Sequence, residues 1–501
     1  MFGMAYLCDE FMKDDALVLQ QYVKAGAIPL VKGNTPQGLS CLYTENTIFG
    51  QALNPRDFQR SCGGISGGDS GMVASKCIPL SLGCDSNGSL NYSAAFCGTV
   101  SMKPTRGRFS SKGIGFPNKI RFNKFDHIKS TAGPIASCVD DCILAFKAQE
   151  DIEISQKDPF QSSHVWNEEM FQEILTPGGD ENQKIKIGML QESPFLPSGS
   201  AVKRAMYQTE MTLRKQGYDV VPFFLTDEVW EQARDFMAAM EANGNASLIL
   251  SDAHSNYENL TGHLADVQNE LEGGFFRTFA SRVKNLIVRS RQTTNNKLLK
   301  KVEEKKFTKL LRQKQVFCNE ISQKWRRQGL TAIISPIFPQ SAIKLNQSQS
   351  LEKLQEYSSI WAVLGFPCGA LPVTTVQSQE EYFNDHYNDN WSHALDKSAQ
   401  GSNGMPINLQ VIGYSHEDEK VLGIMKTLEA SLGLTMEVPH YLVTCVRDSK
   451  EVEQIVERMS VKQGGATPTS QKMIERFSIT PSKLAGEEKM NHASRESTRG
   501  L

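Results

Sequence analysis

The chain has 501 residues, which is enough for a large core in one big domain or in two. Its hydrophobic content of 40% and charged content of 22% are ordinary for a globular protein, and its net charge of −2 gives no reason to expect a nucleic-acid partner. No apolar run could span a bilayer, no secretory signal opens the chain, and the 11 cysteines lack disulfide or zinc spacing. Together these features favour a reduced, intracellular and cytoplasmic protein.

The regular elements alternate between strands and helices along the chain. After a first segment, 1–14, a helix is expected at 14–24 and a strand at 27–31. Apolar runs and amphipathic stretches then predict strands at 78–82, 185–190, 219–223, 332–335, 371–376 and 407–412, and helices at 139–149, 201–216, 351–364 and 416–432. Such alternation favours a mostly parallel sheet with helices on both faces.

Other stretches carry turn residues instead of periodicity. Glycine and proline predict a loop over 106–125 and a turn at 131–134. Residues 150–184 are polar and are expected to form a loop or excursion. The last part, 446–501, is polar and poor in aromatic residues, so it is expected to be disordered. One domain over 15–445 therefore remains.

Residues 227–329 are helical in pattern and rich in charge. Within them, the apolar residues of 275–291 share one helical face, which is flanked by arginine and lysine. A basic amphipathic helix of this kind can lie on a membrane. An ordinary core-facing helix with a solvated basic side fits the same pattern.

Two glycine-rich turns stand out between residues 61 and 105, GGISGG at 63–68 and GCDSNGS at 83–89. Backbone N–H groups that no helix or ladder uses can converge on an anion in such turns. Ser89 therefore offers a hydroxyl beside several N–H groups. Acyl transfer needs both, the hydroxyl as the nucleophile and the N–H groups as the oxyanion hole. Two ordinary tight turns are the alternative interpretation.

Rival motifs are weaker. GDSG at 68–71 is similar to the surroundings of a trypsin-type serine, but the small-residue helical pattern around it does not fit that all-β fold. No phosphate-binding P-loop is present. The nine histidines are dispersed without metal-ligand spacing, so neither a metal nor a cofactor is expected.

The stretch of residues 61–105 resembles the signature of the amidase signature family, which usually has GGSSGG, then GxDxGGS, then G-x-KPT. Here GGISGG, GCDSNGS and SMKPT stand in the same order at the same spacing. Segments AGAIPLVKGNTPQG and STAGPIAS also match, and GFPCGALPVTTV, YFNDHYNDNW and GMPINLQVIG look most like the fatty acid amide hydrolase branch. The resemblance covers residues 15–435. It implies a single large amidase-type α/β domain, with a twisted mixed sheet covered by helices on both faces.

The family uses a Ser–Ser–Lys triad, in which a serine in a cis peptide relays the proton of the nucleophile to a neutral lysine. The resemblance places the nucleophile at Ser89 and the relay serine at Ile65. Ser66 follows one position later as a supporting residue. Because isoleucine has no proton to pass, the relay position is degenerate.

The resemblance also assigns the groups around the nucleophile. Asp85 matches the acidic residue of the turn, and Leu39 falls where a backbone carbonyl contacts the substrate. The oxyanion donors map to the backbone N–H groups of four consecutive residues, Ser86, Asn87, Gly88 and Ser89. Asn87 replaces a glycine of the family, and Asn91 stands where an arginine is usual.

The family lysine maps before Met1, so the chain is expected to be N-terminally truncated relative to the family. Ser66, Lys76 and Lys103 are the first candidates for a substitute base. The resemblance implies a hydrolase of fatty acid amides, a small-molecule partner and peripheral membrane contact through 275–291. A homodimer is a possible state, and nothing in the sequence fixes the oligomeric state. Three interpretations stay open: an active hydrolase, a degenerate member that binds acyl ligands or a protein, and a sequence that lacks an upstream segment.

Overall fold

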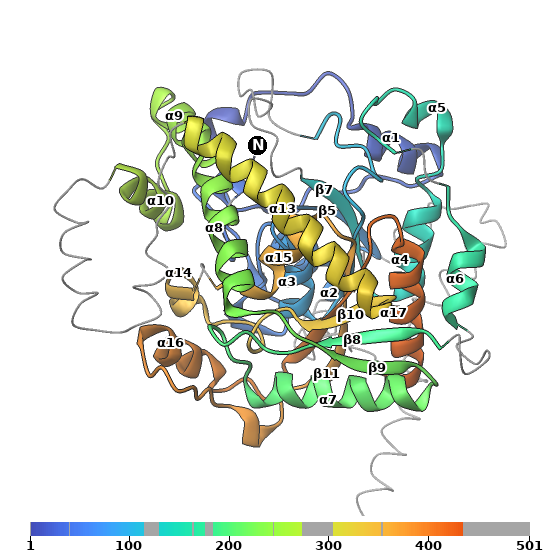
Figure 1. Cartoon of the computed structure of the whole chain (residues 1–501). Coiled ribbons are helices and arrows are strands. Elements are labelled where there is room, and N and C mark those ends of the chain that lie inside the picture. Colours follow the sequence, from blue (N-terminus) through green and yellow to red (C-terminus); the bar gives the residue numbers. More distant parts are fainter. Residues whose placement is uncertain are drawn as a thin grey trace, which may run out of the picture. The chain divides into compact units, whose positions relative to one another are not determined.

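A mixed eight-stranded β-sheet forms the centre of the protein (Figure 1). The computed structural model describes residues 2–39, 41–114, 130–162, 165–175, 184–243, 245–272, 304–351 and 354–433, which belong to the compact unit Met1–Val438. The strands follow one another across the sheet in the order β5 (Leu80–Asp85), β7 (Thr131–Ala136), β6 (Val100–Lys103), β11 (Cys368–Thr375), β12 (Pro406–Gly413), β10 (Ala332–Pro336), β8 (Lys186–Leu190) and β9 (Asp219–Phe223).

The expectation of a mostly parallel sheet is wrong. In this sheet only β10–β8 and β8–β9 are parallel neighbours, and the other neighbouring pairs are antiparallel. Strands β5 and β6 do run in the same direction, but β11 and β12 are antiparallel neighbours although the helix Asn390–Ala399 joins them. However, β7 inserts between β5 and β6, and β12 inserts between β10 and β11. Strand–helix alternation therefore fixes neither the adjacency of two strands nor, in every case, their relative direction, and the mixed α/β architecture is the one that the family resemblance implies.

Residues 131–134 form part of strand β7 and not the expected turn. Pro134 pairs with Leu82 of β5, and the pairing with β6 ends one residue away, at Ile135. A proline without an N–H is tolerated there because β6 requires no hydrogen bond from it. At Gly133 an added Cβ would lie 2.2 Å from the carbonyl oxygen of Met102, so glycine allows the two backbones to approach.

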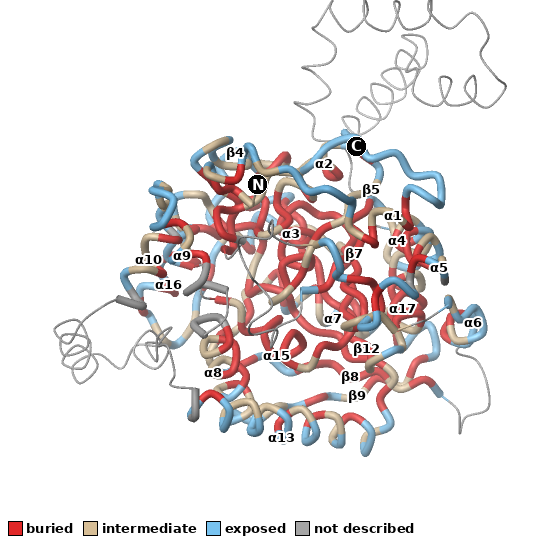
Figure 2. The backbone as a smooth tube through the Cα atoms, turned by 90° about the horizontal axis from the view of Figure 1, so that it is seen from above, coloured by how far each residue is buried: buried red, intermediate tan, exposed pale blue. Residues whose placement is uncertain are grey.

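Helices cover both faces of the sheet. On one face α2 (Gly67–Ala74) and α3 (Ser89–Cys97) pack together, and on the other α17 (Asp418–Leu432) packs beside α4 (Val139–Lys147) and α7 (Ser200–Lys215). A further layer, α8 (Asp227–Asn243) and α13 (Glu304–Gln328), lies against α15 (Glu356–Leu364) (Figure 1). Every residue of α3 is buried, so this helix lies inside the molecule, as Figure 2 shows.

The remaining elements are short. They are η1 (Ala5–Leu7), α1 (Leu17–Lys24), η2 (Gln37–Leu39), β1 (Glu45–Asn46), β2 (Gly50–Gln51), β3 (Leu53–Asn54), β4 (Asp57–Ser61), α5 (Ile152–Ser155), α6 (Glu168–Leu175), α9 (Asn245–Ser255), α10 (Gly262–Glu272), η5 (Leu345–Gln347), α14 (Ser348–Leu351), η6 (Ser378–Glu380) and α16 (Asn390–Ala399). Residues 150–184, expected to be a loop, thus contain α5 and α6.

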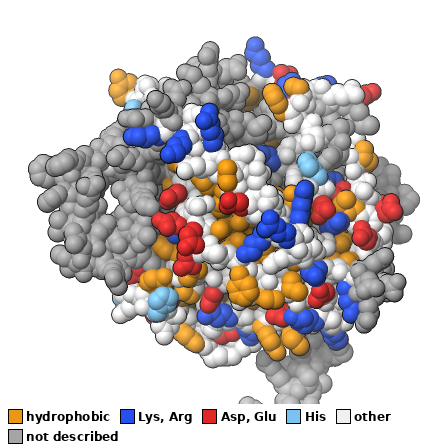
Figure 3. Space-filling model, viewed as in Figure 1, with side chains coloured by type: hydrophobic (Ala, Val, Ile, Leu, Met, Phe, Trp, Pro, Cys, Tyr) orange, Lys and Arg blue, Asp and Glu red, His pale blue; other side chains and the backbone are white. Residues whose placement is uncertain are grey.

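No strand forms at 27–31, where Ile28 is 80% exposed and Leu30 is 71% exposed. This prediction is wrong because an apolar run is a strand signal only where a neighbouring strand can pair with it. Two other predictions, the amphipathic helix at 275–291 and the tail at 446–501, lie outside the described residues. On the face shown in Figure 3, acidic and basic side chains are interspersed, in keeping with the small net charge.

Candidate active site

Ser89 is the first residue of α3, directly after the turn that follows β5. The residue before it, Gly88, has φ 86° and ψ 12°, a left-handed conformation that glycine adopts without strain. A Cβ at this position would also lie 2.3 Å from the Cβ of Ser358 in α15. The turn therefore requires glycine for two reasons, and it places the serine at the N-terminus of a buried helix.

Asp85 holds the shape of this turn. Its Oδ1 accepts a hydrogen bond of 2.8 Å from the Gly88 N–H, and its Oδ2 accepts one of 2.9 Å from the Leu90 N–H. Burial raises the pKa of Asp85, while the charge of Lys103 and the two N–H donors act in the opposite direction. Since the Gly88 N–H is committed to Asp85, the predicted oxyanion donors reduce to the N–H groups of Ser86, Asn87 and Ser89.

Ser89 is 5% exposed, and its hydroxyl donates to the carbonyl oxygen of Cys84. The hydroxyl of buried Ser66 contacts the backbone of the same residue: it accepts from the Cys84 N–H at 3.3 Å and is 3.5 Å from the Cys84 oxygen. The structure thus brings the two serines of the two glycine-rich turns together. A backbone carbonyl is not a base at neutral pH, so this bond does not activate the Ser89 nucleophile.

The Gly64–Ile65 peptide bond is cis, which is the bond that the resemblance assigns to the relay position. The two glycines before Ile65 allow close packing. A Cβ on Gly63 would lie 2.7 Å from the Cα of Ser93 in α3, and one on Gly64 would lie 2.3 Å from the Cys41 oxygen. The isoleucine side chain carries no hydroxyl, and the relay role of this position stays a prediction from the resemblance.

Neither of the two candidate lysines is hydrogen-bonded to Ser89. Lys103, which is 5% exposed, donates to the carbonyl oxygen of Phe366. Lys76 donates to the Ser137 hydroxyl at 3.0 Å. Burial lowers the pKa of Lys76, and the nearby Arg56 charge adds to this effect.

Asn87 and Asn91, which depart from the family pattern, both take part in side-chain pairs. The Asn87 amide N–H donates to Oε1 of Gln355, the N-cap residue of α15. Asn91 donates to Gln410 at 3.1 Å and accepts from Ser101 at 3.0 Å. Gln355 and Gln410 could not be predicted from the sequence, because they lie hundreds of residues away in the chain and no local signal marks them. Leu39 ends η2, and its predicted substrate contact stays a prediction.

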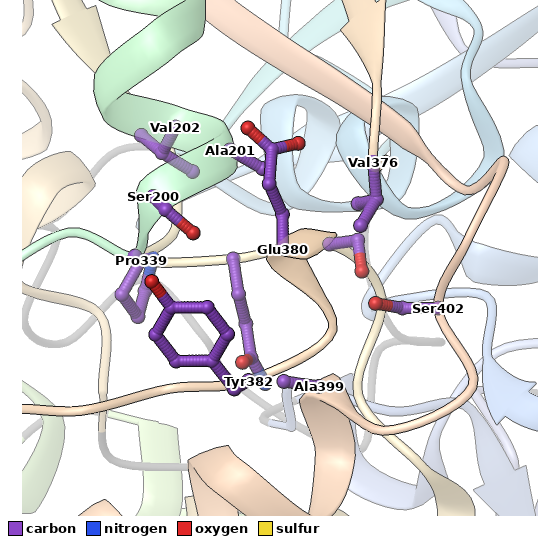
Figure 4. A pocket seen from close by; sticks show the side chains of 12 residues that line it. Ser200, Ala201, Val202, Pro339, Val376, Glu380, Tyr382, Ala399 and Ser402 are labelled. Carbon is purple, nitrogen blue, oxygen red and sulfur yellow. The ribbon is translucent and has the colours of Figure 1, made fainter. Parts of the chain in front are cut away.

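Two of the cavities lined by described residues are small, and neither has residues 86–89 in its wall. One, with a volume of about 10 Å³, lies at the start of α7 and is lined by Ser200, Glu380, Tyr382 and Ser402 among others (Figure 4). It has room for about one water molecule. Among the described residues no His, Cys, Asp and Glu side chains gather into a metal site, and none of the helices is long and apolar enough to cross a membrane.

Comparisons with known proteins identify the family of this chain. The family model described as Amidase matches residues 1–422. Fatty-acid amide hydrolase 1 of Sus scrofa is 24% identical over 433 residues, which are 83% of this chain and 70% of that protein. The vitamin D3 hydroxylase-associated protein of Gallus gallus is 31% identical over 221 residues, which are 44% of this chain and 45% of that protein. A solved structure of a fatty acid amide hydrolase has a TM-score of 0.72 at 19% identity and matches 87% of this chain and 70% of that one. Because the family model spans most of the sequence, this chain belongs to the amidase family.

Proposed function

We propose that this protein is a serine-dependent amidase acting on fatty acid amides, with Ser89 as the nucleophile. The observation that carries the proposal is the position of the Ser89 hydroxyl at the N-terminus of buried helix α3, in a turn held by Asp85. The similarity to a fatty-acid amide hydrolase supports the substrate class.

The chemistry follows from this arrangement. Ser89 Oγ attacks the amide carbonyl carbon, and the carbonyl oxygen takes up the negative charge. The N–H groups of the turn and the positive end of the α3 dipole stabilise that oxyanion. The C–N bond then breaks as the leaving nitrogen takes up the proton that Ser89 Oγ loses, and the amine departs. Water hydrolyses the acyl-serine ester, which releases the fatty acid and returns a proton to Ser89 Oγ. Ile65 cannot relay the Ser89 proton, and since general-base assistance is worth about 10²–10⁴ in rate, turnover below that of a complete family member is expected.

The test is labelling by a serine-directed fluorophosphonate together with hydrolysis of a long-chain fatty acid amide, each measured on the native protein and on Ser89→Ala. Both signals should disappear in the variant. Labelling that Ser89→Ala leaves unchanged would refute the nucleophile. Family-like turnover that Ser89→Ala abolishes would instead point to a substitute base, and Ser66→Ala, Lys76→Met and Lys103→Met would then identify it.

A second candidate function is acyl-ligand or protein binding without turnover. Two observations favour it: an isoleucine occupies the relay position, and the Ser89 hydroxyl donates to a backbone carbonyl and not to a base. In this case a fatty acid amide binds to the protein and is released unchanged, which mass spectrometry of the bound ligand distinguishes from hydrolysis.

The proposal includes weak membrane contact by residues 275–291, which rests on the sequence pattern alone. Flotation with anionic and with neutral liposomes tests it, and Phe275→Ala with Phe279→Ala should weaken the binding. The cytoplasmic location and the homodimer also remain predictions from the sequence. Light scattering of the purified chain checks the homodimer.

A further inference from the structure

The side chain of Asn87 is only half satisfied. Its amide N–H donates to Gln355 Oε1. Its amide oxygen, Oδ1, is buried and has no hydrogen-bond partner within the described part of the chain. A buried acceptor without a partner lowers stability, so its presence beside a nucleophile calls for an explanation.

The surroundings keep this amide in place. Gln355 is the N-cap residue of α15, and its carbonyl oxygen accepts from the N–H groups of Ser358 and Ser359 at 3.2 and 3.0 Å. Ser358 in turn lies against Gly88, where a Cβ would overlap it. Asn87 therefore links the nucleophile turn to the first turn of α15, and its oxygen stays at the turn and does not swing out to solvent.

We propose that Asn87 Oδ1 accepts the N–H of an amide bound at Ser89, and that the site therefore prefers amides with at least one N–H over esters of the same acid. This inference rests on the proposed function, because it names the substrate class of that same site. An amide N–H supplies the donor that Oδ1 lacks, whereas an ester offers acceptors only. A site built to accept an N–H discriminates against analogues without one, since its own polar group then stays unpaired.

Binding to the full-length chain in a Ser89→Ala background tests the preference without turnover. The probes are hexadecanamide and methyl hexadecanoate, measured by titration calorimetry. Adding Asn87→Ala should weaken amide binding about tenfold, the value of one buried hydrogen bond, and leave ester binding within about twofold. Asn87→Gly, which restores the family's residue, should do the same and serves if the alanine variant does not fold.

Gln340→Ala is the matched control. Gln340 is another amide with buried, unpartnered atoms, but it lines the cavity at the start of α7 and not the Ser89 turn. This substitution should leave the affinities for both probes unchanged. The control therefore separates the effect on binding of removing a buried amide elsewhere from the effect of removing the Asn87 amide.

Equal weakening of both probes by Asn87→Ala, unchanged amide binding, or binding of neither probe to the parent protein would overturn the inference. Fluorophosphonate labelling, measured with Ser89 intact, separates this failure from that of the proposed function. Absence of Ser89 labelling together with a selective loss of amide binding would refute catalysis and retain the preference.

Discussion

Asp69 lies in the first turn of α2 and accepts a hydrogen bond from the Ser81 hydroxyl of β5. Burial raises its pKa from the ordinary 3.8 to about 6. Between these values the folded state holds more protons than the unfolded chain, so the free energy of unfolding falls as the pH rises through this window. Asp69→Asn keeps an acceptor for Ser81 and removes the titration. Its melting temperature should exceed that of the native protein at about pH 7 and match it more closely at about pH 4. An equal difference at both pH values would contradict this account.

The turn around the candidate nucleophile could be predicted from the sequence, because its shape depends on residues that are neighbours in the chain. Ser89, Asp85 and Gly88 lie within five positions, and the turn that joins them is a local structure that the glycine pattern indicates. Gln355 was out of reach, because its contact with Asn87 depends on how α15 packs against the turn. The commitment of the Gly88 N–H to Asp85 was also missed, since a motif does not say which N–H groups are already bonded.

At the scale of elements, glycine has opposite effects in β7 and α2. Gly133→Ala should destabilise the protein by more than about 2 kcal/mol, because its Cβ would meet the Met102 carbonyl oxygen, a backbone atom that cannot move without shifting β6. Gly71→Ala is the matched substitution inside α2, where the nearest heavy atom to the new Cβ is 4.0 Å away. It should stabilise the helix by about 0.5–1 kcal/mol. Urea unfolding measures both, and a stabilising Gly133→Ala would show that β6 and β7 can separate.

A comparison of β7 with other strands shows which strands could be predicted from the sequence. Segments 332–335 and 407–412 contain neither glycine nor proline, and they lie in β10 and β12. Residues 131–134 contain a glycine and a proline, which usually punctuate turns. In β7, Gly133 allows close packing against β6, and Pro134 lies where β6 requires no hydrogen bond from it. Both reasons depend on strands that lie elsewhere in the sequence.

For the whole molecule, the polar tail is predicted to be dispensable. A chain that ends at residue 460 should keep the melting temperature of the full protein within about 2 °C, because the removed residues bury too little apolar surface to contribute to the core. Limited proteolysis should cut first within the same region. A drop of several degrees on truncation would show that the tail packs against the folded part.

A buried ion cluster joins the segment after β6 to the start of α17. Arg108, 4% exposed at its side chain, pairs with Asp418 at 3.2 Å and with Glu419 at 2.6 Å. Arg108→Met removes the counter-ion of two buried carboxylates, which keep hydrogen bonds from Thr105 and Asn167, so it should lower the free energy of unfolding by about 3–5 kcal/mol. Lys147→Met breaks the exposed pair with Glu168 and is the control, with an expected loss below about 1 kcal/mol. Urea unfolding of both variants decides the matter. Similar small losses would mean that water reaches the Arg108 cluster and that α17 is held by its apolar face alone.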